Sequence, residues 1–324
     1  MICDLAGQFM ALAEKQSATF PLVLGHRLVG TSLAHTGDLM QGRAHLDQAI
    51  ALYDPAAHRP LATRFGQDVR MASLLRRSIA LWSLGYPEAA LADVDYALKD
   101  AREIGHAATL FMALFFGSWI HLFCGNYAAG HALVDEGLAL AEEKGALTWK
   151  AVGPNFRGAL FAMTGKASDA VITLTSGITS TRSMGTTLHL PRTLAHLATA
   201  HAELGQFDDA WRCIEEAITV AERTKETWFE AEVNRVAGEI ALKPLEPDAA
   251  KAEAYFGRAL AVARQQQAKS WELRAAMSMA RLSRDQGKRQ QARDLLAPVY
   301  GWFTEGFDTL DLKEAKALLD ELHA

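Results

Sequence analysis

Gly158 and Lys166 bound a segment, GALFAMTGK, that has the glycines and the lysine of a phosphate-binding loop. Such a loop needs four residues between its glycines and a serine or threonine after the lysine, because the backbone cradles the phosphates and the hydroxyl binds magnesium. Here six residues separate Gly158 from Gly165, and Ala167 follows the lysine. The segment therefore does not predict a nucleotide site.

Histidines are the next candidates, since the chain has 11 of them and His189, His196 and His201 are close in sequence. His189 and His196 are seven residues apart, which in a helix places them roughly 10 Å apart on one face. One metal ion cannot reach both without other ligands. No H-E-x-x-H motif occurs. We expect structural histidines, no metal site and no cofactor.

Candidate nucleophiles and paired carboxylates do not predict a reactive site either. Cys3, Cys124 and Cys213 are far apart and belong to no C-x-x-C motif, so they predict neither a disulfide framework nor a zinc site. No G-x-S-x-G motif is present. Carboxylate pairs such as Glu142 and Glu143 are expected on solvated helix faces or at helix starts. The chain is therefore predicted not to be an enzyme.

Composition limits the classes of protein and of partner that remain possible. The 324 residues are 50% hydrophobic and 22% charged, which is typical of a folded soluble protein. The net charge of −5 offers no basic surplus for phosphate groups, so no nucleic-acid partner is expected. The most apolar window, residues 110–124, is shorter than the ~20 residues of a membrane-spanning helix. We expect a buried helix there, no membrane contact and a cytoplasmic location.

Internal repeats dominate the sequence. Glycines suited to helix-turn-helix turns recur every 40 residues, at Gly85, Gly125, Gly165 and Gly205. Small residues recur seven positions before each turn, at Ser78, Ser118, Gly158, Ala198 and Gly238. Small residues also recur twelve positions after each turn, at Ala97, Gly137, Gly177 and Ala217. Because small residues let helices pack closely, these shared periods predict a solenoid of helix pairs.

The repeated units resemble the tetratricopeptide repeat. The fifth unit matches its pattern through Ala198, His201, Gly205, Phe207, Ala210, Ile214 and Ala217, and the third through Ser118, Gly125, Tyr127, Gly130, Val134 and Gly137. His201 replaces the usual aromatic residue, and the period is 40 residues instead of about 34. The resemblance implies an all-α, right-handed solenoid of about seven helix pairs with a C-terminal capping helix.

The period divides the chain into units. Residues 1–20 are expected to form the second helix of a truncated preceding repeat, and residues 306–324 the capping helix. The seven repeats are expected at 21–54, 69–105, 106–146, 147–186, 187–227, 228–268 and 269–305. Residues 55–68 hold two prolines and are expected to be a loop insertion. A half repeat leaves an apolar face bare, so we expect the array to continue upstream or to self-associate there.

A second resemblance suggests a biological setting. Residues 58–62 (HRPLA), 65–69 (FGQDV) and 81–91 (LWSLGYPEAAL) resemble a signature of a bacterial family, and residues 295–300 and 302–307 are similar to its C-terminal end. Members combine a class III adenylate or guanylate cyclase domain, an AAA-type ATPase domain and a C-terminal repeat array. Similar endings occur in ATPase-repeat proteins without the cyclase and in transcriptional regulators. The resemblance implies a role in signal transduction.

The tetratricopeptide resemblance also implies a concave groove lined by the first helix of each pair. Carried over to this chain, its apolar middle is Met112, Phe115, Trp119, Leu122 and Phe123. Its polar positions include Arg27, Thr31, His35, Asn155, Arg192, Arg235, Arg274 and Arg281. The apolar set is also compatible with buried core, and the arginines of the last repeat with a solvated face. If these arginines bind a ligand, an acidic peptide tail suits them better than a phosphate.

These observations predict a non-catalytic array that binds a protein or peptide partner. The first hypothesis is a C-terminal sensor or scaffold arm of a multidomain signalling protein, which binds a partner or packs on the ATPase or cyclase domains of its own chain. The alternative is a stand-alone adaptor that holds a peptide or helix in its groove. Under both, any enzymatic activity would reside in domains outside this chain.

Overall fold

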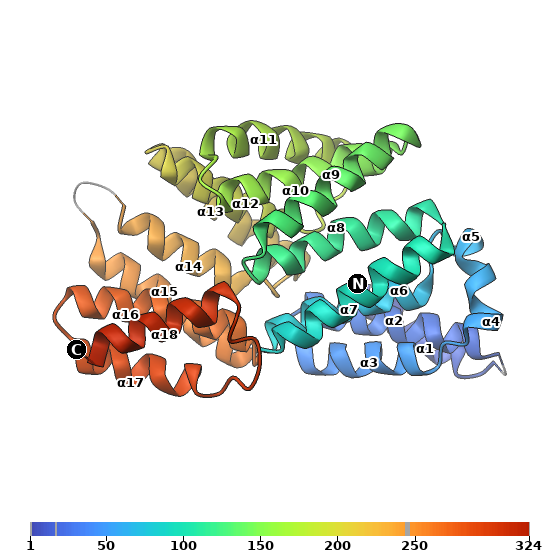
Figure 1. Cartoon of the computed structure of the whole chain (residues 1–324), viewed down its shortest axis with the longest axis horizontal. Helices are drawn as coiled ribbons and strands as arrows, with labels where there is room; N and C mark the ends of the chain where they lie inside the picture. Colours follow the sequence, from blue (N-terminus) through green and yellow to red (C-terminus); the bar gives the residue numbers. More distant parts are fainter. Residues whose placement is uncertain (1, 17, 244–246, 324) are drawn as a thin grey trace.

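The computed structural model describes residues 2–16, 18–243 and 247–323, and every regular element within these ranges is a helix (Figure 1). The all-α solenoid predicted from the sequence is confirmed. Seven antiparallel helix pairs follow one another: α2 (Thr19–His35) with α3 (Leu39–Ala51), α6 (Val69–Ser83) with α7 (Pro87–Ile104), α8 (Ala107–Phe123) with α9 (Tyr127–Glu143), α10 (Leu147–Met163) with α11 (Ala167–Ser183), α12 (Leu190–Glu203) with α13 (Phe207–Thr224), α14 (Glu230–Ala241) with α15 (Ala249–Gln265), and α16 (Lys269–Asp285) with α17 (Arg289–Tyr300).

The turns between paired helices use the predicted glycines. Gly85 and Gly205 have φ angles of 94° and 73°, a left-handed conformation that costs glycine little. The residue after each glycine donates its backbone N–H to a carbonyl in the last turn of the preceding helix, as Gln206 does to His201 at 2.9 Å. This hydrogen bond satisfies a helix-end carbonyl and reverses the chain direction.

Small residues produce the close packing within each pair. A Cβ atom added to Gly158 would lie 2.6 Å from Cγ of Leu174 on the paired helix, and one added to Gly238 would collide with the ring of Phe256. The helices of these two pairs therefore approach at a distance that only glycine permits at these positions.

The segment between α3 and α6 differs from the expected loop. It contains three short helical turns, α4 (Pro55–His58), the 3₁₀ turn η1 (Arg59–Leu61) and α5 (Ala62–Phe65). Asp54 caps the first turn by accepting a hydrogen bond from the N–H of Ala56, and Pro55 occupies its first position. Proline is well suited to a first helical position because it lacks the N–H that would have no partner there.

Two further helices lie at the ends of the array. α1 (Ile2–Ala13) packs against α2, while Leu5 and Leu12 of α1 are 61% and 60% exposed. α18 (Leu310–His323) covers the last pair and buries Leu312 and Leu318, as the predicted capping helix should. No helix in the described part of the chain is both long and apolar enough to cross a bilayer.

The solenoid closes on itself, so that the orange helices of the C-terminal repeats lie beside the blue and cyan helices of the first repeats (Figure 1). The Ser270 hydroxyl on α16 donates a hydrogen bond to the carbonyl of Trp82 on α6. The N–H of Thr227 donates to the carbonyl of His35 at 2.9 Å. The first helices of distant repeats therefore meet on the inner face, where the main hydrophobic cluster includes Leu39 of the first repeat and Trp271 of the last.

Candidate binding site

The apolar residues predicted for the groove are largely buried. Phe115, Trp119, Leu122 and Phe123 are at most 2% exposed, and Met112 is 8% exposed. The aromatic members of this set contact rings from neighbouring repeats. Phe123, for example, stacks on the Trp82 ring with the two centroids 4.6 Å apart. The inner face is filled because the superhelix is tightly closed. This burial favours the alternative in which the apolar set is core.

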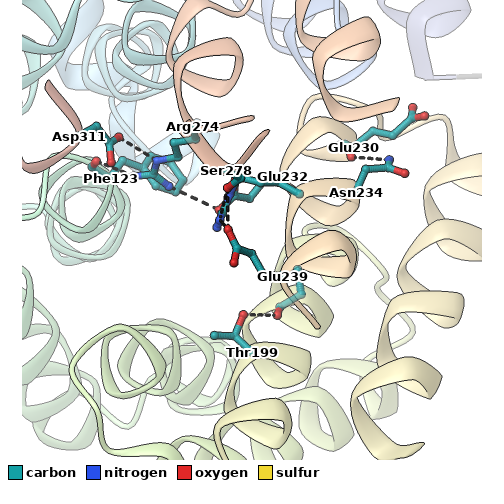
Figure 2. Close-up of polar contacts among 11 residues, drawn as sticks. Phe123, Thr199, Glu230, Glu232, Asn234, Glu239, Arg274, Ser278 and Asp311 are labelled. Atoms are coloured by element: carbon teal, nitrogen blue, oxygen red, sulfur yellow. Dashed lines mark hydrogen bonds and ion pairs between the residues drawn. The ribbon is translucent and has the colours of Figure 1, made fainter. Parts of the chain in front are cut away.

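The three groove arginines predicted in the last two repeats, Arg235, Arg274 and Arg281, are paired with acids of the same chain. Figure 2 shows Arg274 between Asp311, at 2.7 Å, and the carbonyl of Phe123, at 2.9 Å. Arg235 binds Glu232 through two hydrogen bonds of 2.7 and 2.8 Å. The more exposed Arg281 pairs with Glu314 at 2.7 Å. Their charges are balanced within the chain and hold the last repeats together, which leaves little attraction for an acidic partner.

A different site lies on the inner face, where four first helices converge. We call it the inner pocket, a cavity of about 220 Å³. Its wall includes residues from α6, α8, α10 and α12 and from the loop before α12, among them Arg76, Met112, Phe116, Trp149, Asn155, Leu188 and Arg192. Leu188 is 46% exposed and forms part of the rim, whereas Arg192 is 1% exposed. The pocket thus combines an apolar wall with buried polar groups.

The two arginines of the inner pocket are held by aromatic rings. The guanidinium carbon of Arg192 lies 4.0 Å from the ring centre of Trp119, and that of Arg76 lies 4.2 Å from the ring centre of Phe116. Among the described residues, Nε and Nη1 of Arg192 and Nε of Arg76 have no hydrogen-bond partner. Burial lowers the pKa of Arg192 to about 9 and that of Arg76 to about 10, so both are charged at neutral pH.

Beside these arginines lies a cluster of two histidines and one glutamate. Nδ1 of His189 is 3.2 Å from Oε1 of Glu226. Glu226 also accepts the backbone N–H of His189 at 3.0 Å and the indole N–H of Trp228 at 3.1 Å. The ring of His35 lies 5.2 Å from that of His189. Glu226 therefore supports both the side chain and the backbone of His189.

This cluster is poorly suited to catalysis or to a metal ion. Burial lowers the pKa of His35 to about 3 and that of His189 to about 4, so both are weak bases at neutral pH. Ligand atoms of His35, His189 and Glu226 lie within 4.8 Å of one another, as in a metal site. However, Nη1 of Arg76 is only 3.5 Å from Nε2 of His189. The adjacent positive charge opposes a divalent cation.

The other candidates from the sequence do not assemble into a reactive site. Residues 158–163 form the end of α10 and residues 164–166 the turn to α11, whereas a phosphate-binding loop connects a strand to a helix. Burial raises the pKa of the Cys124 thiol to about 12 and that of Cys213 to about 11, so neither is a reactive thiolate at neutral pH. The side chain of Cys3 lies outside the described residues.

Two of the larger hollows share an arginine that is paired within the chain. Their volumes are about 820 and 570 Å³, and Arg258 lines both. This arginine pairs with Glu230 at 2.9 Å. The inner pocket is smaller, but its buried donors are unused.

The predicted site residues are thus brought together only in part. Met112, Trp119, Asn155 and Arg192 line the inner pocket, whereas Arg235, Arg274 and Arg281 belong to ion pairs elsewhere. Sequence reasoning missed Arg76, Trp149, Leu188, His189 and Glu226 as members of the site. Arg76 is one of three arginines in α6, with Arg70 and Arg77, so no sequence signal singles it out, and the loop residues carry no local pattern.

Comparison with known proteins supports the fold. A family model described as anaphase-promoting complex subunit 5 matches residues 165–229. No curated protein matches the sequence significantly. The chain is similar to a Rap protein solved with Competence and Sporulation Factor (TM-score 0.64, 11% identity, 98% of this chain and 81% of that chain covered).

Two other solved structures are also similar. One is the Rap conjugation gene regulator of plasmid pLS20 with the Phr* peptide (TM-score 0.61, 10% identity, 94% and 75% covered). The other is aspartyl phosphate phosphatase F from Bacillus subtilis (TM-score 0.56, 11% identity, 94% and 75% covered). At such identities the likeness concerns the fold alone. The chain is a helical repeat protein of the tetratricopeptide type.

Proposed function

We propose that this chain is a non-catalytic interaction array that binds a peptide, or an extended segment of a protein, at the inner pocket. The observation that carries the proposal is a cavity on the inner face with an apolar wall and with buried polar groups that have no hydrogen-bond partner among the described residues. Such groups fix the orientation of a ligand, while the apolar wall supplies contact area. Two structures with the same fold were solved with Competence and Sporulation Factor and with the Phr* peptide.

The pocket size suggests how much of a partner enters it. Its volume of about 220 Å³ is below the roughly 300–1,000 Å³ of a site that encloses a drug-sized ligand. The pocket therefore takes one or two residues of the partner, and the rest of the peptide lies along the rim near Leu188.

A rim substitution tests the proposed site. Leu188→Asp places a charge on the exposed rim, and Leu147→Asp places the same charge at the start of α10, where Leu147 is 79% exposed. We expect the unmodified protein, immobilised on beads, to retain a distinct subset of a random pentapeptide pool, measured by mass spectrometry. Leu188→Asp should reduce that retention at least about tenfold, because a charged rim disfavours apolar contact.

Leu147→Asp should leave retention unchanged. Retention of no subset by the unmodified protein would refute peptide binding. Equal retention by both variants would place the binding site elsewhere.

For the biological setting we propose a regulatory arm of a bacterial multidomain signalling protein, with cyclase and ATPase domains outside this chain. The support is the resemblance of residues 58–62, 65–69 and 81–91 to that family. The alternative is a stand-alone adaptor. An immunoblot of source cells distinguishes them, since an adaptor would run near 35.3 kDa and a multidomain protein well above it.

A further inference from the structure

The inner pocket holds more positive charge than the described residues neutralise. Arg76 and Arg192 line it, and Arg27 lies close enough to lower the pKa of Arg76. The acid of this cluster is Glu226, while buried His35 and His189 are neutral at pH 7. Three arginines and one glutamate leave an excess of two positive charges. Burying an unpaired charge is costly, so a fold tolerates it where a ligand completes the pair.

Aromatic rings cover the faces of the two guanidinium groups in the inner pocket. Trp119 covers a face of Arg192 and Phe116 a face of Arg76, and the two rings contact each other with centroids 4.7 Å apart. A ring against the face of a guanidinium leaves the N–H donors in the plane free. In-plane guanidinium donors can bind the oxygens of a carboxylate. Nε and Nη1 of Arg192 have no hydrogen-bond partner among the described residues, but both are enclosed by the chain, so a carboxylate meets them only when the Arg192 side chain shifts.

Asn155 lines the pocket, but its polar atoms face α11. Nδ2 of Asn155 donates to the hydroxyl of Thr181 at 2.9 Å, and Oδ1 is enclosed by the chain against Gly177. The arginines and the apolar wall are therefore the features that would select a ligand. The apolar wall, which includes Trp149 and Val152, suits a hydrophobic group on that ligand.

We propose that the inner pocket binds a carboxylate that has a hydrophobic group beside it, with Arg76 and Arg192 as the residues that recognise the carboxylate. The C-terminal residue of a peptide has this chemistry, and so does a free N-acyl amino acid. This inference rests on the proposed function, since it names the chemical group that the same pocket selects.

Matched ligands test the inference. The immobilised protein is given a pentapeptide pool synthesised without aspartate and glutamate, once with free C-terminal carboxylates and once with C-terminal amides. A third pool has amide ends and contains aspartate and glutamate. N-acetylphenylalanine and its amide supply the free small molecule. We expect at least about tenfold better retention of the free acids than of the matching amides, because the amide offers no charge to the guanidinium groups.

Variants identify the groups responsible. Arg192→Met should abolish the preference for acids, and its thermal midpoint should be unchanged or higher, because an unpaired buried charge is replaced by an apolar side chain. Arg192→Lys keeps the charge without the planar guanidinium and should retain only part of the preference. Arg281→Met removes a charge that is paired with Glu314 and serves as the matched control.

The outcomes separate this inference from the proposed function. Equal retention of acid and amide peptides would overturn the inference and leave peptide binding intact. Binding of N-acetylphenylalanine but of no peptide would support the carboxylate site and overturn peptide binding. Arg192-dependent retention of the third pool would support the inference with a side-chain carboxylate as the source. If no ligand binds, or if Arg192→Met keeps the preference in a folded protein, the inference is wrong.

Discussion

His189 adopts a left-handed backbone conformation, with φ of 63°, although it carries a bulky side chain. Glu226 accepts a hydrogen bond from the backbone N–H of this residue, and its Oε1 lies 3.2 Å from Nδ1 of the imidazole ring. Such a conformation is uncommon outside glycine and persists where the surroundings hold it. Here it shapes the loop that contributes Leu188 to the rim of the inner pocket, so a buried carboxylate positions part of the binding site.

The same buried residues predict a loss of stability in acid. Burial lowers the pKa of His189 to about 4, below its ordinary value of 6.5. Between these values the unfolded chain binds the proton more readily, so the stability present above pH 6.5 is lost as the pH falls towards 4. Between about pH 7 and about pH 4.5, His189 alone should lower the free energy of unfolding by on the order of 2 kcal/mol.

Urea unfolding at the two pH values measures this loss. His189→Asn should reduce the pH dependence, because asparagine does not titrate and tolerates the left-handed conformation. His201→Asn, at a half-buried position in the last turn of α12, serves as the comparison variant. An unaltered pH dependence in His189→Asn would contradict the role given to this histidine.

At the scale of helices, the spacing of small residues determines how closely the two helices of a pair approach. Gly238 on α14 faces the ring of Phe256 on α15 with no room for a Cβ atom. Gly257 follows Phe256 on α15 but faces open space and is exposed. The two glycines therefore serve different purposes, although both lie inside helices.

Alanine at these two positions should have opposite effects on stability. Gly238→Ala should destabilise the protein by about 1–3 kcal/mol, because the added methyl group overpacks the helix pair. Gly257→Ala should stabilise it by roughly 0.5–1 kcal/mol, because it lowers the entropy of the unfolded chain without a clash. Denaturant unfolding measures both. The same sign for the two variants would show that close approach at Gly238 is not required.

For the whole molecule, the main feature is closure of the solenoid. Gly306 donates its N–H to Glu88 at 2.7 Å, and Glu305 accepts the N–H of Ala89 at 3.0 Å, so the segment before the cap is tied to the second repeat. In an open repeat array each unit contacts only its neighbours. Here the first and last repeats share a core, which is why the predicted apolar groove is filled and only a small pocket stays accessible.

Sequence reasoning succeeded where the determinants are local. The turn at Gly205 and the small residue at Gly238 are recognisable from spacing alone, because each depends on residues within one helix pair. Closure depends on contacts such as Ser270 with Trp82, between residues 188 positions apart, which no periodic pattern encodes. The inner pocket was therefore found only in part: Arg192 follows from its groove position, whereas Glu226 lies in a loop and contacts His189, which is 37 positions away.

Hydrogen–deuterium exchange with and without the most strongly retained free-acid peptide tests the central claim most directly. If the peptide binds at the inner pocket, its addition should slow exchange of backbone amides in the loop before α12 and at the adjoining ends of α10 and α12, because these segments line the pocket. Protection confined to the second helices α9, α11 and α13, or no change at saturating peptide, would contradict binding on the inner face.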